Sequence, residues 1–185
     1  MNIINISEVN KREDFGLFLN TRGLTNIAVE VGVHRGASAV PFLNKWNGKT
    51  FYAIDIWDKF DGDEIGISET RYLDHLQAVN VLNQFRDRID IRILKATSVK
   101  GSEIVPNNDI DFVYIDANHQ YEYVKQDIEV WYPKIKYGGI IGGHDYVFNS
   151  SHGSLDVKKA VDEFAINNNK DIYFIPNSSS WYIIK

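Results

Sequence analysis

The chain contains no cysteine among its 185 residues, so disulfide bonds, cysteine-ligated zinc, iron–sulfur clusters and thiol nucleophiles are all excluded. It also lacks any apolar run near the roughly 18 residues that a membrane-spanning helix requires. A secretory signal peptide has an apolar core behind a basic region, and Met1–Asp14 lacks this pattern. We therefore expect a cytoplasmic protein that does not bind a membrane.

Positive charge is scarce as well. The chain has 20 Lys and Arg against 25 Asp and Glu, a formal net charge of −5. This balance argues against a basic nucleic-acid-binding surface. No repeat, low-complexity tract or Pro/Gly-rich linker divides the chain. With 44% hydrophobic and 24% charged residues, the composition is that of a globular protein, and the length suits a single core.

Short apolar, β-branched runs alternate with stretches of helical periodicity. Strands separated by helices form parallel βαβ units. We therefore predict an α/β fold: a Rossmann-like, doubly wound, mostly parallel seven-stranded sheet with helices on both faces. The last two runs are separated by only a few residues, which predicts a C-terminal antiparallel hairpin. The seven predicted strands are Ile27–Val31, Thr50–Ile56, Ile89–Leu94, Ile110–Ile115, Gly139–Gly142, Ile172–Ile175 and Trp181–Ile184.

Helices are predicted where apolar residues recur three or four positions apart. Ser7–Leu19 is predicted as an N-terminal helix that ends near Gly23, so residues 1–24 form a helix or lid and residues 25–185 a single domain. Asp156 is the predicted N-cap of the last helix. The apolar stripes are Leu73, Leu76, Val79 and Leu82; Tyr121, Val124, Ile128 and Trp131; and Val157, Ala160, Val161 and Phe164.

The first predicted strand ends in an acid followed by a glycine turn, Glu30-Val-Gly32-Val-His34-Arg-Gly36. Glycine allows a tight turn and close approach of a ligand, and the N–H groups of the next helix favour an anion. The spacing differs from a dinucleotide-binding G-x-G-x-x-G turn, because His34 stands in place of the middle glycine. A side chain there would crowd a pyrophosphate but admit a smaller ligand. The alternative is a strand–helix turn that binds nothing.

Polar residues also end the next two strands. Asp55 ends the second strand, where Rossmann-like sites hold ribose hydroxyls through charge-assisted hydrogen bonds. Thr97 and Ser98 follow the third strand, at a turn that offers an amide and a hydroxyl to an adenine ring. The alternatives are that Asp55 caps the following turn and that Thr97 or Ser98 caps a helix.

Acids and imidazoles follow the fourth and fifth strands. Asp116 and His119 end one strand, and His144 and Asp145 end the other. Adjacent strands lie about 4.8 Å apart, and close carboxylates repel unless one is protonated or a cation bridges them. We therefore predict a site for Mg²⁺, Mn²⁺ or Ca²⁺ at Asp116, His144 and Asp145, with His144 either a ligand or a partner of Asp145. His119 is the candidate general base. Taken singly, each of these residues could instead cap a helix or lie solvated in a loop.

Together these motifs resemble class I S-adenosylmethionine-dependent methyltransferases. The chain looks most like the small bacterial O-methyltransferases related to macrocin-type and cephalosporin-hydroxylase-type enzymes, and more distantly like catechol O-methyltransferase. The resemblance covers about residues 25–185. It rests on the following motifs and on their order along the chain: Val29–Gly32 with Gly36, Ala53–Asp55, Phe112–His119, and Gly138–Ile140 before His144–Tyr146.

The resemblance implies roles for these residues. Glu30 and Gly32 would line the methionine end of the donor, Asp55 would bind the ribose, and Asp116 would lie between donor and acceptor. The metal-dependent members place an acidic pair after strand five, where this chain has His144-Asp145, a softer pair of ligands. With the residues argued above, the predicted catalytic residues are Asp116, His119 and Asp145. The predicted donor-binding residues are Glu30, Gly32, His34, Gly36, Asp55, Thr97, Ser98 and Asp116.

The predicted reaction is transfer of a methyl group from S-adenosylmethionine to an acceptor oxygen, a hydroxyl of a sugar, glycan or small natural product. A divalent cation, Mg²⁺ first, is the predicted second cofactor, and a homo-oligomer is compatible with the sequence. Any lid would come from the N-terminal helix, the Asp58–Thr70 loop or a partner subunit. Base N-methylation is disfavoured, because Asp116-Ala-Asn118 stands in place of a Pro-Pro-aromatic motif.

Two alternatives belong to other classes. An NAD-dependent oxidoreductase is disfavoured by the incomplete glycine turn and because the Tyr-x-x-x-Lys spacing of Tyr121–Lys125 falls on the wrong helix. A non-catalytic module that binds a nucleoside ligand would keep Glu30, Gly32 and Asp55 but would show no turnover.

Overall fold

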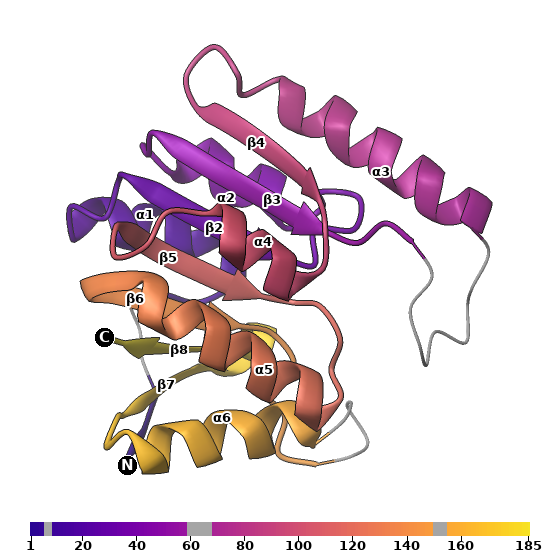
Figure 1. The fold of residues 1–185 in the computed structure, drawn as a ribbon. Helices are drawn as coiled ribbons and strands as arrows, with labels where there is room; N and C mark the ends of the chain where they lie inside the picture. Colours follow the sequence, from indigo (N-terminus) through magenta and orange to yellow (C-terminus); the bar gives the residue numbers. More distant parts are fainter. Residues whose placement is uncertain (6–8, 59–67, 150–154) are drawn as a thin grey trace.

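The computed structural model describes residues 1–5, 9–58, 68–149 and 155–185 (Figure 1). Most of the predicted Asp58–Thr70 lid lies outside the described residues. So do the start of the predicted Ser7–Leu19 helix and the serines of the loop after the fifth predicted strand.

Eight strands form one sheet in the order β1-β7-β8-β6-β5-β2-β3-β4. Neighbouring strands are parallel except where β8 pairs antiparallel with β6 and β7. The predicted fold class and C-terminal hairpin are confirmed, with one strand more than expected. The strands are β1 (Ile3–Asn5), β2 (Ile27–Val31), β3 (Thr50–Asp55), β4 (Asp90–Lys95), β5 (Ile110–Ile115), β6 (Ile135–Gly143), β7 (Ile172–Ile175) and β8 (Ser180–Ile184).

The additional strand β1 is too short for its periodicity to predict it. It pairs with β7, nearly the whole chain away, in the register Ile3 to Ile172. The helix that follows is shorter than predicted. A 3-10 turn, η1 (Arg12–Asp14), leads into α1 (Phe15–Thr21), and Gly23 follows with a φ of +68°.

Helices cover both faces of the sheet, each over its own apolar core. α1, α2 and α3 pack on one face, and α4, α5 and α6 on the other. No helix among the described residues combines the length and apolar character needed to cross a membrane. The remaining elements are α2 (Ala39–Lys45), α3 (Ser68–Asn83), α4 (Ser98–Ile104), α5 (Tyr121–Trp131), α6 (Asp156–Asn167), and the 3-10 turns η2 (Tyr132–Lys134) and η4 (Pro176–Ser178).

The centre of the sheet is where the strand order reverses. From β2 the chain builds outward to β3 and β4, then crosses back to β5 on the other side of β2. Every residue of β2 and β5 is buried, as expected for central strands covered on both faces. The carboxyl ends of these two strands bound the crevice in which α/β sheets bind ligands.

Gly32 allows these two strand ends to approach. Its φ is +91°, and a Cβ atom there would lie 2.0 Å from the carbonyl oxygen of Asp116. Any other residue at position 32 would therefore force the ends of β2 and β5 apart.

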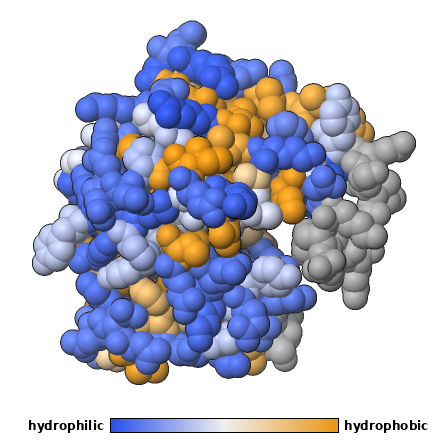
Figure 2. Space-filling model, viewed as in Figure 1, coloured by the Kyte–Doolittle hydropathy of each residue, from blue (hydrophilic) through white to orange (hydrophobic). Residues whose placement is uncertain are grey.

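The predicted apolar stripe of α3 is wrong for Leu73 and Leu76, which are 61% and 45% exposed, and is confirmed for Leu82, which is buried. Asp74 and Ala78 complete the buried face. Asp74 lies on the buried face of α3 because its carboxylate pairs with side chains of the glycine turn. Figure 2 shows a band of hydrophobic residues across the upper half of the molecule, where β4, α3 and α4 lie in Figure 1.

Asp156 does not cap its own helix as predicted. The N-cap of α6 is Leu155, which makes no side-chain capping hydrogen bond. Asp156 Oδ2 instead accepts a hydrogen bond from the backbone N–H of Tyr121 at 3.2 Å. This carboxylate therefore stabilises the start of the neighbouring helix α5, close to the functional strand ends.

Candidate active site

A pocket of about 580 Å³ opens at the carboxyl ends of β2, β3, β4 and β5. In Figure 1 the arrowheads of β3, β4 and β5 point to this edge. The volume lies within the range of about 300–1,000 Å³ that is typical of small-molecule sites. Six of the predicted donor-binding residues line it: Gly32, His34, Asp55, Thr97, Ser98 and Asp116. Arg12, Tyr123, Gln126 and Asp127 also line it, and the sequence did not single them out.

Glu30 lies beneath one end of this pocket, in an adjoining small cavity. Its side chain is buried, and the Ser38 hydroxyl donates a hydrogen bond to it. Burial raises the pKa of Glu30 to about 8, with a further increase from the charge of Asp116 and an opposing effect of Ser38 and Arg12. At neutral pH this carboxyl group is therefore mostly protonated, and a ligand cation placed against it would favour release of the proton.

His34 occupies the left-handed conformation that a glycine would adopt, with a φ of +52°. Its ring does not lie free over the turn, because Nε2 is 3.1 Å from Asp74 Oδ2 on α3. Arg35 Nε donates to the other oxygen of the same carboxylate at 2.6 Å. Gly36 has a φ of +81°, and a Cβ there would lie 2.8 Å from a methyl group of Val81. Gly36 is thus explained by the packing of α3, and it does not line the pocket.

Asp55 stabilises two turns at once. Its Oδ2 accepts the backbone N–H of His34, and its Oδ1 accepts that of Trp57, each at 2.8 Å. Asp55 therefore caps the following turn, as one interpretation of the sequence had it, and also faces the pocket. Each carboxylate oxygen keeps a lone pair with which to accept a hydroxyl of a ligand.

At the end of the pocket near β4, polar side chains form hydrogen bonds below the pocket surface. Thr97 is the N-cap of α4, and its hydroxyl oxygen accepts from the Lys100 N–H at 3.3 Å. Ser98 Oγ accepts from Trp131 Nε1 at 2.9 Å and forms a hydrogen bond with the buried Asp127. Burial raises the pKa of Asp127 to about 7, and the hydrogen bond with Ser98 opposes this.

The sequence did carry a signal for Asp127. It is an acid on the apolar face of the predicted helix, between Val124 and Trp131. A carboxylate in such a stripe needs a buried partner or a ligand, and the structure supplies Ser98.

The structure brings Asp116, His119, His144 and Asp145 together beside this pocket. His119 Nε2 lies 3.1 Å from Asp145 Oδ2 and 3.6 Å from Asp116 Oδ1. His144 Nδ1 lies 3.2 Å from Asp145 Oδ1 and 4.0 Å from Asp116 Oδ1. The two residues at each strand end therefore form one cluster, centred on the two carboxylates.

The charges within this cluster compensate one another. Asp116, and then the charge of Asp145, raise the pKa of His119. The hydrogen bond with Asp145 raises the pKa of His144, and it lowers that of Asp145 in return. Arg12 adds a further cation, with Nη1 3.4 Å from Asp116 Oδ2. Two adjacent carboxylates are therefore balanced by groups of the protein itself.

Asp116, His144 and Asp145 also fit a divalent cation. One ligand atom from each lies within 4.8 Å of the others. Two carboxylates and one imidazole suit Mn²⁺, Fe²⁺ or Zn²⁺ better than Mg²⁺, which prefers six oxygen ligands. A cation here would compete with the proton of His144 and with the guanidinium of Arg12.

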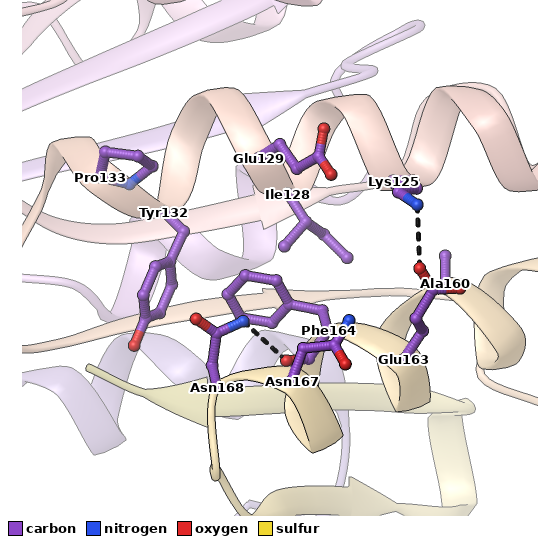
Figure 3. A pocket seen from close by; sticks show the side chains of 10 residues that line it. All are labelled: Lys125, Ile128, Glu129, Tyr132, Pro133, Ala160, Glu163, Phe164, Asn167 and Asn168. Carbon is purple, nitrogen blue, oxygen red and sulfur yellow. Dashed lines mark hydrogen bonds and ion pairs between the residues drawn. The ribbon is translucent and has the colours of Figure 1, made fainter.

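A second hollow, of about 340 Å³, lies between α5 and α6 (Figure 3). Lys125 and Glu163 pair across it at 2.9 Å, and the rings of Tyr132 and Phe164 pack edge to face at 4.8 Å between centroids. It is lined by none of the residues predicted for a site. The pocket at the strand ends is therefore the candidate active site.

The chain is similar to methyltransferases both in sequence and in fold. A family model described as a methyltransferase domain matches residues 29–146. A search of curated proteins gives no significant match. Solved structures similar to the chain include a Staphylococcus aureus protein assigned as a caffeoyl-CoA O-methyltransferase, with a TM-score of 0.66 and 16% identity over 97% of this chain and 85% of that one.

Two further structures show how widely the fold is shared. An O-methyltransferase from Bacillus cereus, in complex with S-adenosylhomocysteine, has a TM-score of 0.61 and 14% identity over 94% of this chain and 80% of that one. A Clostridium thermocellum protein assigned as an rRNA methylase has a TM-score of 0.62 and 14% identity over 96% of this chain and 97% of that one. These similarities concern the fold, and they do not identify the acceptor.

The family match runs from the strand that carries Glu30 and the glycine turn to the pair His144-Asp145, and it spans more than half of the chain. It therefore includes the carboxyl end of every strand that borders the pocket. The chain belongs to the methyltransferase-domain family and is a class I S-adenosylmethionine-dependent methyltransferase.

Proposed function

We propose that this enzyme transfers the methyl group to an acceptor oxygen, a hydroxyl of a sugar, glycan or small natural product. The observation that carries the proposal is the cluster of Asp116, His119, His144 and Asp145 beside the donor pocket. Asp116 belongs to both, since it lines the pocket and contacts the cluster. A hydroxyl that enters beside Asp116 would meet a carboxylate-paired imidazole next to the donor.

The orientation of the donor follows from the same residues. We place its methionine portion at the end bordered by Gly32 and Asp116, its ribose at Asp55, and its adenine at Thr97 and Ser98. The positive sulfur then lies nearest Asp116, at the boundary between donor and acceptor. Trp57 is buried and stacks on His75, with ring centroids 4.4 Å apart, so it supports the Asp55 turn instead of stacking on a ligand.

The reaction is an in-line displacement at the methyl carbon. A bond forms between the acceptor oxygen and this carbon as the carbon–sulfur bond breaks, and the sulfonium becomes a neutral thioether. The protein aligns the two centres and removes the proton of the acceptor. We assign proton removal to His119, because Asp116 and Asp145 hold its ring and stabilise the imidazolium that forms. Asp116, His144 and Asp145 would hold a divalent cation, which would supply a positive charge that lowers the pKa of an acceptor hydroxyl.

The proposal is tested by turnover with a panel of hydroxyl and amine acceptors, measuring S-adenosylhomocysteine release and the mass and linkage of the product. We expect an O-methylated product. His119→Gln should lower kcat by about 10²–10⁴-fold, the contribution typical of general acid–base catalysis, with little change in the Kd of S-adenosylhomocysteine. Glu103→Gln, an exposed residue on α4, is the matched control and should leave both values unchanged. Methylation of amines alone, or donor binding with no turnover on any acceptor, would contradict the proposal.

A further inference from the structure

The candidate donor pocket contains a guanidinium that the chain contributes from outside the family match. Arg12 belongs to η1, whereas the methyltransferase-domain model begins at residue 29. Its side chain is about one-third exposed (34%) and lines both the donor pocket and the small cavity around Glu30. The N-terminal segment therefore places a positive charge at the end of the pocket where we place the methionine portion.

The backbone that carries Arg12 is fixed by packing and by charge. Phe15, three residues on, is buried, and its ring lies 5.0 Å from that of Phe112 on β5. Asp14 pairs with Lys45 of α2 at 2.7 Å. The segment is therefore held against both the central sheet and the helix that follows the glycine turn, and the guanidinium is presented at a defined place.

The described residues around Arg12 leave most of its hydrogen-bonding capacity for a ligand. The contact with Asp116 joins one nitrogen, Nη1, to one oxygen at 3.4 Å, which is long for a charge-assisted hydrogen bond. A guanidinium has five N–H donors in a planar fork that matches a carboxylate in bidentate geometry. Among the residues that the structure describes, this contact alone holds Arg12 at the edge of the pocket, and it does not use that fork.

The opposite charges at this end match a zwitterion. Glu30 and Asp116 supply carboxyl groups, and Arg12 supplies a guanidinium within electrostatic reach of both. The methionine portion of S-adenosylmethionine carries an ammonium and a carboxylate on one carbon. Its ammonium has acidic partners here, and its carboxylate requires a cation.

We propose that Arg12 binds the α-carboxylate of the donor's methionine portion, so that the N-terminal segment forms one wall of the donor site. This inference rests on S-adenosylmethionine occupying the pocket in the orientation given above. The segment of residues 9–21 would then form part of the donor site as well as pack against the sheet. Arg12 is then a binding residue with a second effect, because its positive charge compensates the negative charge of Asp116 before the donor binds.

The test compares two ligands that differ only in the carboxylate: S-adenosylhomocysteine and its decarboxylated analogue, S-adenosyl-3-thiopropylamine. Their Kd values are measured by isothermal titration calorimetry with the wild type, Arg12→Met and Arg12→Lys. The wild type should bind S-adenosylhomocysteine about 10- to 100-fold more tightly, which is the range for one hydrogen-bonded charge pair. In Arg12→Met this ratio should fall to near one, and Arg12→Lys should retain an intermediate ratio.

The ratio separates this role from simple charge compensation. If Arg12 only neutralises Asp116, both ligands bring the same ammonium to the altered site, and the ratio persists in Arg12→Met. That result would overturn the proposal. Arg86→Met, an exposed arginine just beyond α3, is the matched control and should keep the wild-type ratio. If the wild type binds neither ligand, the donor assignment itself fails, and the inference fails with it. Unchanged thermal unfolding of each variant establishes that the fold is intact.

Discussion

Replacing Glu30 with glutamine should stabilise the fold and weaken donor binding at the same time. Glu30 is 3% exposed, and its pKa is raised from 4.5 to about 8. Glutamine has nearly the same shape and keeps an oxygen that accepts the Ser38 hydroxyl, but it carries no ionisable proton. The substitution therefore removes the titration of a buried carboxyl group without leaving a cavity.

The direction of the change in folding stability with pH follows from the pH range in which each state binds the Glu30 proton. The folded chain keeps the Glu30 proton up to about pH 8, whereas the unfolded chain releases it near pH 4.5. The stability associated with protonated Glu30 is therefore complete below pH 4.5 and is lost as the pH rises from 4.5 to about 8. At pH 7 the loss amounts to about 3 kcal/mol, at about 1.4 kcal/mol for each pH unit above 4.5.

The assay is urea unfolding of the wild type and Glu30→Gln between pH 4.5 and pH 8. We expect the variant to gain about 3 kcal/mol at pH 7 relative to its difference from the wild type at pH 4.5, or about 6–12 °C in Tm for a chain of this length. Its affinity for S-adenosylhomocysteine should fall, because the acidic partner of the ligand's ammonium is lost. Glu103→Gln is the exposed control. Parallel pH dependences for the wild type and Glu30→Gln would refute the reasoning.

Three further predictions concern the other acids and the metal. Asp127→Asn should stabilise the fold by about 3–4 kcal/mol at pH 7, because the pKa of this buried carboxyl rises from 3.8 to about 7 and its stability contribution is lost between those values; urea unfolding that shows no gain would contradict this. Asp116→Ala should abolish turnover while weakening donor binding less, as measured by kcat and by calorimetry, and unchanged kcat would refute its assignment. Treatment with a chelator should reduce activity, and Mn²⁺ should restore it better than Mg²⁺; full activity after chelation would exclude a metal at Asp116, His144 and Asp145.

The strand ends could be predicted from the sequence because their signals are local. An apolar run that stops at Glu30, Asp55 or Asp116 indicates both a strand and the polar residue at its carboxyl end. In parallel βαβ units, all of these ends meet at one edge of the sheet. The meeting of Asp116 and His119 with His144 and Asp145 needed only this rule and the order of the strands.

The remaining features depend on contacts between distant segments, which no local pattern records. β1 forms because Ile3 pairs with Ile172 at the edge of the sheet. The orientation of α3 depends on Asp74, whose carboxylate pairs with His34 and Arg35. Arg12 gave no signal in the sequence, because its contact with Asp116 joins positions that are 104 residues apart. Apolar periodicity placed Leu73 and Leu76 on the buried face of α3 wrongly, because it does not take into account the ion pairs that hold Asp74 there.

The most direct test of the central claim is a thermal shift measurement with S-adenosylhomocysteine and with NAD, on the wild type and on Asp55→Ala. At about 100 times its Kd, a ligand stabilises the fold by about 2.7 kcal/mol, or about 5–10 °C here. We expect this shift for the wild type with S-adenosylhomocysteine, a much smaller one for Asp55→Ala at the same concentration, and none with NAD. No shift of the wild type with S-adenosylhomocysteine, or an equal shift with NAD, would contradict the assignment of the pocket to a methyl donor.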